Sequence, residues 1–223
     1  MRPSRIFSLC LIAGLSLAVL VATHAQATPE WMATPPGEPP EVSGKVEKAL
    51  VLLTAVGKTP VEIACEGLTI EKGLLEVEGK GSATASFTGC LTWVNGKLAP
   101  NCKPHSPSAA AGTITTNPLV GLLKLHTLEG GAKEGLIELA PKTGTVFVMT
   151  ELGPLCAVGN KFNVTGTLFA RDSGGELEVE AETHLLEASS ALGGVLFGAN
   201  AATLDGAVRL NLVEGGFWSG LGE

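Results

Sequence analysis

The cysteines are the residues of this chain whose type and spacing point most directly to chemistry. Beyond the first 27 residues there are four, and they are open to metal binding, to thiol redox chemistry or to disulfide formation: Cys65, Cys90, Cys102 and Cys156. Cys102-x-x-His105 has the spacing of half a zinc site, but structural zinc sites bring ligands in close pairs and no second pair occurs. A redox Cys-x-x-Cys is also missing from the sequence. We therefore expect disulfides, with no metal and no other cofactor.

A hairpin signal lies between two of these cysteines. Asn95-Gly96 is typical of a type I′ turn, in which both central residues have positive φ. Counting outward from this turn places Pro100 at a position without a ladder hydrogen bond, where its missing N–H costs nothing. A one-residue bulge after Pro100 brings Cys102 opposite Cys90. The expected domain therefore contains a hairpin stapled by a Cys90–Cys102 disulfide.

The remaining two cysteines then form the second disulfide. Cys65 would pair with Cys156, tying an early strand to one in the middle of the chain. An even number of cysteines in an exported chain is typical of such a disulfide framework.

Catalytic residues are harder to find. Glu176, Glu178, Glu180 and Glu182 alternate along an expected strand, and a pair of carboxylates can act as acid and base of a glycosidase. The alternate residues Leu177, Val179 and Ala181 supply a buried side, so a solvated strand face explains the same pattern. No nucleophile elbow, zinc-protease helix or phosphate-binding glycine loop occurs in the sequence. We assign no catalytic residue and keep a glycan hydrolase only as a remote alternative.

The histidines give no support to a catalytic or metal site. His105, His126 and His184 lie among polar neighbours or on the outward side of their segments, so exposed positions are expected. Their spacing pairs none of them with a serine nucleophile.

Aromatic residues are scarce, which limits sugar binding. The chain has no tyrosine, and its only tryptophans outside residues 28–44 are Trp93 and Trp218. Sugar-binding sites use exposed flat rings. Trp93, next to the expected hairpin turn, is the one candidate ligand-binding residue. The alternative is that it packs across the strand pair against Leu98.

The first 27 residues predict export. Arg2 and Arg5 precede an apolar run from residue 6 to 22, and the small-x-small site at residues 25–27 follows it. We interpret residues 1–27 as a signal peptide, with an uncleaved membrane anchor as the alternative. Cys10 would leave with the signal. Residues 28–44 are rich in proline, which is typical of an extended spacer, and Trp31 within them is expected to pack on nothing.

Charge excludes several partners. Loss of Arg2 and Arg5 leaves 13 basic against 22 acidic residues, a net charge of −9. Because the basic residues are scattered, no cluster is available to bind phosphates, so we expect no nucleic-acid partner. An acidic surface also repels anionic lipids, so contact with a membrane is expected only through the signal peptide before cleavage. The expected location is extracellular or in the cell envelope.

Residues 45–223 have the pattern of strands. Apolar residues alternate in "KFNVTGTLFA", "GELEVEAET" and "AVRLNLV", and "GLIELAPKTGTVFVM" indicates two strands joined by a hairpin loop at residues 141–144. Residues 45–56 fit either a short helix or a buried strand. Glycine and proline divide the segments at the spacing typical of a sandwich or barrel. We predict one all-β domain, an antiparallel β-sandwich or a barrel-like fold.

A resemblance covers about half of the chain. The order "IACEG", "FTGCL", "NCKP", "GTITTNPLVGLL", "GPLCAVGNKF" resembles a group of uncharacterised, secreted, β-rich bacterial proteins with four cysteines. The resemblance implies export, a β fold and the cysteine pattern, and it transfers no catalytic residue. The expected function is that of a secreted or envelope protein that acts by binding or structure, with cell-wall glycan as a candidate partner and a carbohydrate-binding module as the alternative.

We predict that the exported protein begins at Thr28. The small residues Ala25 and Ala27 form the cleavage site, so N-terminal sequencing of the secreted chain should start with Thr-Pro-Glu. A secreted chain that still begins at Met1 would contradict this.

Overall fold

The all-β expectation is confirmed. The computed structural model describes residues 29–34, 39–131, 133–174 and 177–221, and these contain strands and no helix. The expected signal peptide, residues 1–27, lies outside the described residues, as does Glu176. Residues 45–56, for which a helix was the alternative, belong to a strand.

The described residues include fifteen strands, and most of these belong to one antiparallel sheet. The first seven are β1 (Glu30–Thr34), β2 (Val42–Val56), β3 (Thr59–Cys65), β4 (Gly67–Leu75), β5 (Lys80–Thr88), β6 (Leu91–Val94) and β7 (Lys97–Leu98). The next four are β8 (Ile114–Thr115), β9 (Leu119–Thr127), β10 (Lys133–Pro141) and β11 (Val146–Glu151). The last four are β12 (Lys161–Asp172), β13 (Thr183–Phe197), β14 (Asn200–Leu212) and β15 (Phe217–Leu221).

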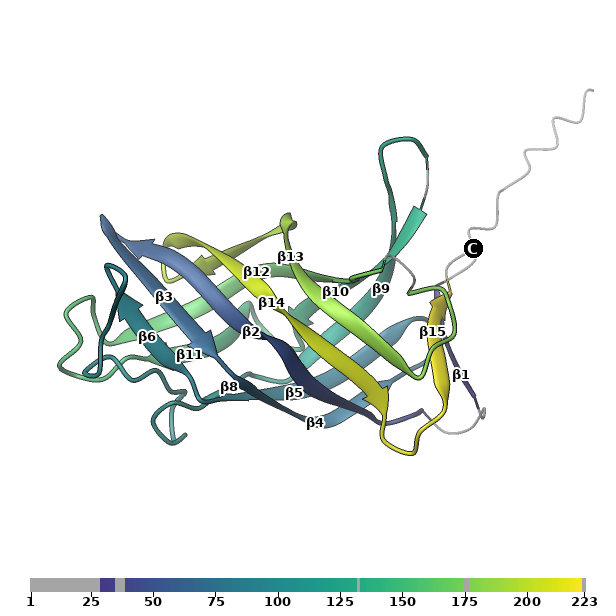
Figure 1. Ribbon diagram of the computed structural model, residues 1–223, viewed down its shortest axis with the longest axis horizontal. Helices are drawn as coiled ribbons and strands as arrows, with labels where there is room; N and C mark the ends of the chain where they lie inside the picture. Colours follow the sequence, from purple (N-terminus) through teal and green to yellow (C-terminus); the bar gives the residue numbers. More distant parts are fainter. Residues whose placement is uncertain (1–28, 35–38, 132, 175–176, 222–223) are drawn as a thin grey trace, which may run out of the picture.

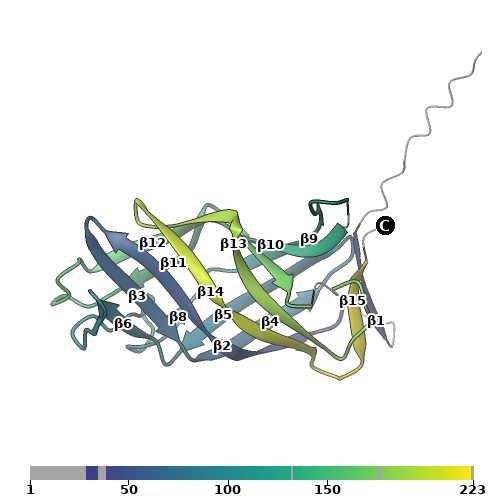
Figure 2. The same ribbon diagram turned by 45° about the horizontal axis from the view of Figure 1, so that its top comes forward.

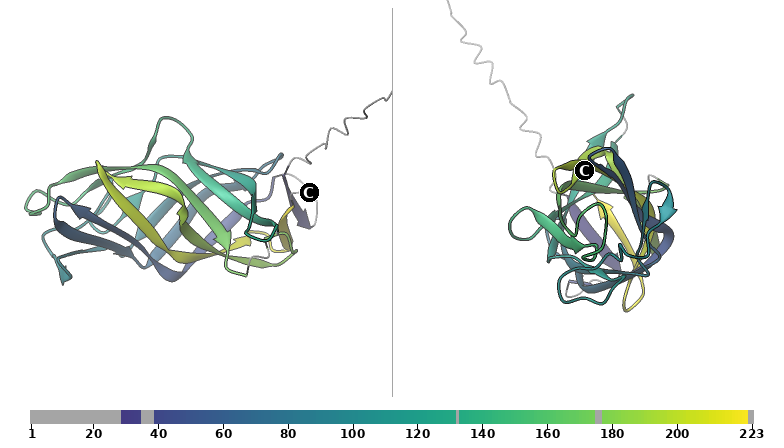
Figure 3. Two further views of the ribbon diagram at one scale, coloured as in Figure 1. Left: turned by 90° about the horizontal axis from the view of Figure 1, so that it is seen from above. Right: turned by 90° about the vertical axis from the view of Figure 1, so that its left-hand side faces the viewer.

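The large sheet curls until it closes on itself. Its order runs β4-β5-β9-β10-β12-β13-β14-β2 and continues through β3 and β6 to β7. Strands β2 and β4 then meet, because Glu41 and Leu74 form a bridge and the Leu75 N–H donates to the Pro40 carbonyl at 3.0 Å. Eight strands therefore form a ring. Figure 1 shows them running obliquely along the long axis, and Figure 3 shows them surrounding one interior.

Alternation within the strands decides which residues enter this interior. Along β12, Val164, Leu168 and Ala170 line the interior, while Asn163 is exposed. The register between β12 and β13 shifts after Thr167. Just before this shift, Gly166 pairs with β13 and has a φ of 116°. A side chain at Gly166 would collide with the carbonyl of Gly194, so the two strands approach closely only because glycine stands here.

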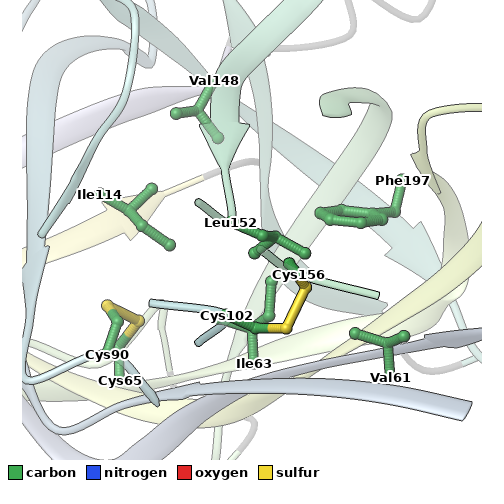
Figure 4. Close-up of a cluster of buried hydrophobic side chains, with 10 residues drawn as sticks. All are labelled: Val61, Ile63, Cys65, Cys90, Cys102, Ile114, Val148, Leu152, Cys156 and Phe197. Carbon is green, nitrogen blue, oxygen red and sulfur yellow. A yellow bond between two sulfur atoms is a disulfide. The ribbon is translucent and has the colours of Figure 1, made fainter. Parts of the chain in front are cut away.

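Each end of the ring is filled by its own apolar cluster. At one end, Leu123, Leu177 and Trp218 are the most deeply buried members of a cluster that the small β1–β15 sheet covers. At the other end, a second cluster gathers Val61, Phe197 and the four cysteines. Figure 2 shows β1 and β15 together at one end of the molecule and β3 and β6 towards the other, and Figure 4 shows the second cluster with its disulfides.

The four cysteines of the described residues form disulfides, but the expected pairing is wrong. Cys65 bonds Cys90 and Cys102 bonds Cys156. The cause is a ladder between β3 and β6 in which Ala64 faces Leu91, so that one step further Cys65 faces Cys90. This pairing joins residues far apart in sequence, and the local hairpin pattern carries no sign of it.

The hairpin itself is confirmed over its first two pairs. Asn95 and Gly96 have φ of 53° and 72°, and Trp93 faces Leu98. The chain then leaves the strand direction, because the Cys102 N–H donates to the Ala99 carbonyl at 2.9 Å in a tight turn. Cys102 consequently turns away from Cys90, and the disulfide staples this hairpin to β3 instead of closing it on itself.

The prediction of a second hairpin, around residues 141–144, is also wrong. Strands β10 and β11 do form, but they do not pair with each other. Both pair with β12: Leu139 of β10 faces Leu168, and Val146 of β11 faces Thr165. The long β12 thus binds both segments in succession, and the loop between them carries the chain along β12.

We predict that peptide mapping without reduction will recover Cys65 linked to Cys90 and Cys102 linked to Cys156. Replacing either pair by serine should lower the free energy of unfolding by about 3 to 4 kcal/mol, because the bonds close loops with sequence separations of 25 and 54 residues. Denaturant unfolding would measure the loss. A linkage of Cys90 to Cys102 would contradict the β3–β6 register.

Candidate functional site: an apolar cavity inside the ring

A cavity of about 300 Å³ lies inside the ring, between the two apolar clusters. Its wall includes Val42, Leu75 and Leu186 from one cluster and Ile63, Val148 and Phe197 from the other. The volume is at the lower end of the range found for small-molecule sites. The interior of an eight-stranded ring is just wide enough either to be filled by side chains or to hold one small ligand, and here the side chains leave space.

Small residues at inward positions create this space. Strand β5 places Gly81, Ala83 and Ala85 on the cavity, and β9 adds Gly121. Ala170 and Ala188 contribute from β12 and β13. Larger, branched side chains at these positions would meet across the ring and fill its interior. The sequence "KGSATASFT" carries this signal in the alternating small residues Gly81, Ala83 and Ala85, but this face becomes a cavity wall only because the ring closes.

No charged side chain lines the cavity among the described residues. The polar ones are hydroxyls, and two of them already have partners in the protein. Ser82 Oγ donates to Glu76 Oε1 at 2.6 Å, and Thr116 Oγ1 accepts from the Ala85 N–H at 3.0 Å. A ligand in this cavity is therefore held by contact with carbon atoms, and burying a charged group there would be costly.

Trp31 closes one end of the cavity, contrary to the expectation that it packs on nothing. Its ring lines the cavity and lies edge-on to Trp218 with centroids 5.9 Å apart. Its Nε1 donates to the Lys80 carbonyl at 2.7 Å. Gly220 lies directly against this ring and against Leu123, and a Cβ there would come within about 3 Å of both. Part of the expected spacer, strand β1, is thus packed onto the domain.

A buried histidine anchors the same end, and the expected exposed position of His184 is wrong. The side chain is 2 % exposed, with Nδ1 3.0 Å from Asp172 Oδ2 and Nε2 2.8 Å from the Trp218 carbonyl. A carbonyl only accepts, so Nε2 donates to it, and Nδ1 is hydrogen-bonded to the Asp172 carboxyl group. Asp172 Oδ1 also accepts from the Gly174 N–H at 2.9 Å. This network joins β12 and β13 of the ring to β15.

The remaining expected site residues lie elsewhere. Trp93 is half-buried and borders a hollow beside the β6–β7 hairpin, together with Pro60 and Glu62. Its cross-strand neighbour Leu98 is 53 % exposed, so pairing with Trp93 leaves about half of the Leu98 surface in water. Trp93 has no contact with the interior cavity, since it is absent from that wall. It stays a candidate for ligand binding on the surface.

Glu178, Glu180 and Glu182 do not lie on a strand face. Residues 177–182 form a turn and an isolated bridge in which Ala181 pairs with Trp218. Leu177 is fully buried, whereas Val179 is 54 % exposed. The regular alternation of the sequence therefore does not persist in the structure, and the strand-borne carboxylate pair considered for a glycosidase is not formed by residues 177–182.

The zinc alternative loses its first ligand, because the Cys102 sulfur is bonded to Cys156. His105 instead forms a backbone bridge with Glu151, and its Nε2 lies 3.6 Å from Glu151 Oε2. Within the described ranges, no three His, Cys, Asp or Glu side chains are grouped as metal ligands. The same ranges include no helix of the length and apolarity needed to cross a membrane.

The ionisable groups with shifted pKa values lie on the surface. Hydrogen bonding to Lys48, together with the Gly206 N–H, lowers the pKa of Asp205. Likewise, the hydrogen bond and ion pair with Lys80 lower the pKa of Glu78 and raise that of Lys80. Exposed pairs of this kind contribute little to stability. They are separate from the cavity wall and assign no chemistry to it.

Comparison with known proteins adds no assignment: no protein family matches this chain, and neither a curated protein nor a solved structure is similar to it.

We predict that Asp172→Ala will lower the free energy of unfolding by about 1 to 3 kcal/mol, because it leaves the buried Nδ1 of His184 and the Gly174 N–H without their partner. The double variant Asp172→Ala/His184→Phe should recover part of this loss, since both polar partners are then removed. Lys48→Ala, which breaks an exposed ion pair, is the control and should cost about 0 to 1 kcal/mol. Equal costs for Asp172→Ala and Lys48→Ala in urea unfolding would contradict the buried network.

Proposed function

We propose that this is an exported protein that acts by binding, and that it encloses a small apolar molecule in the cavity of the ring. The observation that carries the proposal is the cavity itself, whose described wall holds no charged group and whose few hydroxyls are largely satisfied. Apolar cavities of this kind stay dry and bind apolar molecules. The described wall carries no charged acid or base, which favours binding over catalysis.

The energy of such binding comes from transfer of hydrocarbon out of water. Each buried methylene contributes about 0.8 kcal/mol, so a medium-length alkyl chain gains about 8 kcal/mol before the loss of rigid-body freedom. That loss is at least about 4 kcal/mol. The remaining gain of at most about 4 kcal/mol corresponds to a dissociation constant of about 1 mM. The protein would therefore hold its ligand reversibly.

Export and an extracellular or envelope location are part of the same proposal. The sequence of residues 1–27 favours export, and the two disulfides are compatible with an oxidising compartment. Membership of the uncharacterised secreted family that the cysteine landmarks resemble is proposed on those landmarks alone. An apolar molecule that must cross water outside the cell requires a protein interior to shield it.

Glycan binding at Trp93 is the second candidate function. The hollow that Trp93 borders with Pro60 and Glu62 favours it. The half-buried flat ring of Trp93 can stack on a sugar, and the Glu62 carboxylate can accept a hydrogen bond from a sugar hydroxyl. Pull-down of the protein on cell-wall and polysaccharide panels tests this candidate. Trp93→Ala should then abolish retention, and no retention of the wild type would exclude it.

We predict that the wild-type protein binds 1-decanol with a negative change in heat capacity, measured by titration calorimetry at several temperatures, because apolar surface is buried. Ala85→Leu and Ala170→Leu should weaken binding by about tenfold or more, because their added carbons fill the cavity. Ala201→Leu on an exposed position of β14 is the matched control and should bind as the wild type.

Circular dichroism and urea unfolding would show that the variants keep the fold. Folded wild-type protein without a heat of binding would overturn the proposal. Equal affinities of the wild type and both cavity variants would place the binding site outside the ring.

A further inference from the structure

We propose, on the basis of the function proposed above, that the ligand is a single unbranched hydrocarbon chain without a charged group in its buried part. It lies along the axis of the ring and enters past Trp31 at the end covered by β1 and β15. Three features carry this inference: the length of the cavity, the chemistry of its wall and the different closure of its two ends.

The cavity is long for its volume. Its wall runs from Trp31 and Val42 at the β1–β15 end to Ile63 and Phe197 at the disulfide end. A volume of about 300 Å³ that extends between the two ends of the ring is narrow, a shape that fits one unbranched chain better than a broad ring system.

The wall chemistry restricts the buried part of the ligand. Across the middle of the ring the wall consists of aliphatic groups such as Leu50, Leu139 and Leu204. A carboxylate or ammonium group there would find no partner of opposite charge among the lining residues. A polar end of the ligand must therefore stay at an end of the ring.

One end of the ring is closed by covalent and ladder bonds. The disulfide Cys65–Cys90 ties β3 to the start of β6, and Cys102–Cys156 ties the two long loops together. His105 and Glu151 add two backbone hydrogen bonds of 2.9 and 2.7 Å. Opening this end would require the breaking of a sheet edge and of loops that the disulfides hold.

The other end is closed by a separate part. Strands β1 and β15 pair only with each other and belong to no ladder of the large sheet. Among the described residues, few hydrogen bonds attach them to the rest of the domain: the mutual pair of Ala181 and Trp218, Gly220 N–H to the Leu177 carbonyl, His184 to Trp218, and Trp31 to Lys80. Segments with so few connections open at lower free energy than the sheet they cover.

Within this β1–β15 sheet, Trp31 is the residue that touches the cavity. Trp218 is held by His184 and by backbone bonds, whereas the Trp31 side chain has one hydrogen bond to the ring, to the Lys80 carbonyl. Its indole is therefore the group whose displacement exposes the apolar wall. We assign Trp31 the role of a positioning residue that closes the ring over the ligand.

Ligand shape can be tested with two alcohols of equal carbon number, 1-decanol and cyclodecanol, by titration calorimetry on the wild-type protein. The unbranched alcohol should bind at least about tenfold more tightly, because the cyclic one overpacks a narrow channel. Similar affinities for the two alcohols would overturn the assignment of an unbranched chain. No binding of either alcohol would instead refute the proposed function.

The route can be tested by the exchange rate of bound deuterated 1-decanol with unlabelled 1-decanol, followed by nuclear magnetic resonance. Trp31→Ala should raise the dissociation rate by about tenfold or more, since residence times depend on the closing contact. Trp31→Phe keeps a ring without the bond to Lys80 and should give an intermediate rate. Leu155→Ala, which shortens an exposed side chain outside the cavity wall, is the control and should leave the rate unchanged.

The double variant Cys102→Ser/Cys156→Ser loosens the opposite end and should also leave the rate unchanged, provided that circular dichroism shows a folded protein. Faster exchange in this variant, with a normal rate in Trp31→Ala, would place the route at the disulfide end. A normal rate in Trp31→Ala on its own is sufficient to overturn the assignment of Trp31. The wild-type binding measurement keeps either result separate from a failure of the proposed function.

Discussion

Closure of the large sheet between β2 and β4 is the contact on which the rest of the structure depends. It is a thin contact in terms of hydrogen bonds, a bridge between Glu41 and Leu74 with the bond from Leu75 to Pro40 beside it. Its effect is large, because it covers the edge of β4 and the part of β2 that β3 does not pair, and it gives the inward side chains of eight strands one common interior. Without it, Leu50 on β2 and Ala85 on β5 would face water instead of the same cavity.

The common interior explains why the core is divided. In a packed ring the inward side chains meet in the middle, but here glycine and alanine on β5, β9, β12 and β13 keep the wall thin. Large side chains are concentrated at the ends instead, with Trp218 and Leu177 at one end and Phe197 with the disulfides at the other. The stability of the domain therefore lies in its two ends, and the middle is free to hold a ligand.

The two ends are closed by different means, and this difference is functional in our interpretation. The disulfide end is closed by parts of the large sheet and its loops. Strand β3 pairs with β6, and a disulfide joins the loops around Cys102 and Cys156. The opposite end depends on a short two-stranded sheet whose polar anchors are buried: His184, Asp172 and the Trp218 carbonyl. A buried network of this kind specifies one arrangement of the cover, because any other leaves its polar atoms without partners.

The sequence by itself determined what depends on neighbouring residues: most strand segments, the type I′ turn at Asn95-Gly96 and the oxidation of four cysteines. These follow from side-chain alternation, positive φ at two adjacent residues and the even number of cysteines. Only the tertiary structure decided the disulfide partners, the burial of His184 and Trp31, the loss of the glutamate strand and the cavity. Each of these depends on pairing between distant strands, such as β3 with β6 or β1 with β15, and sequence alternation specifies a face without naming the strand that will lie opposite.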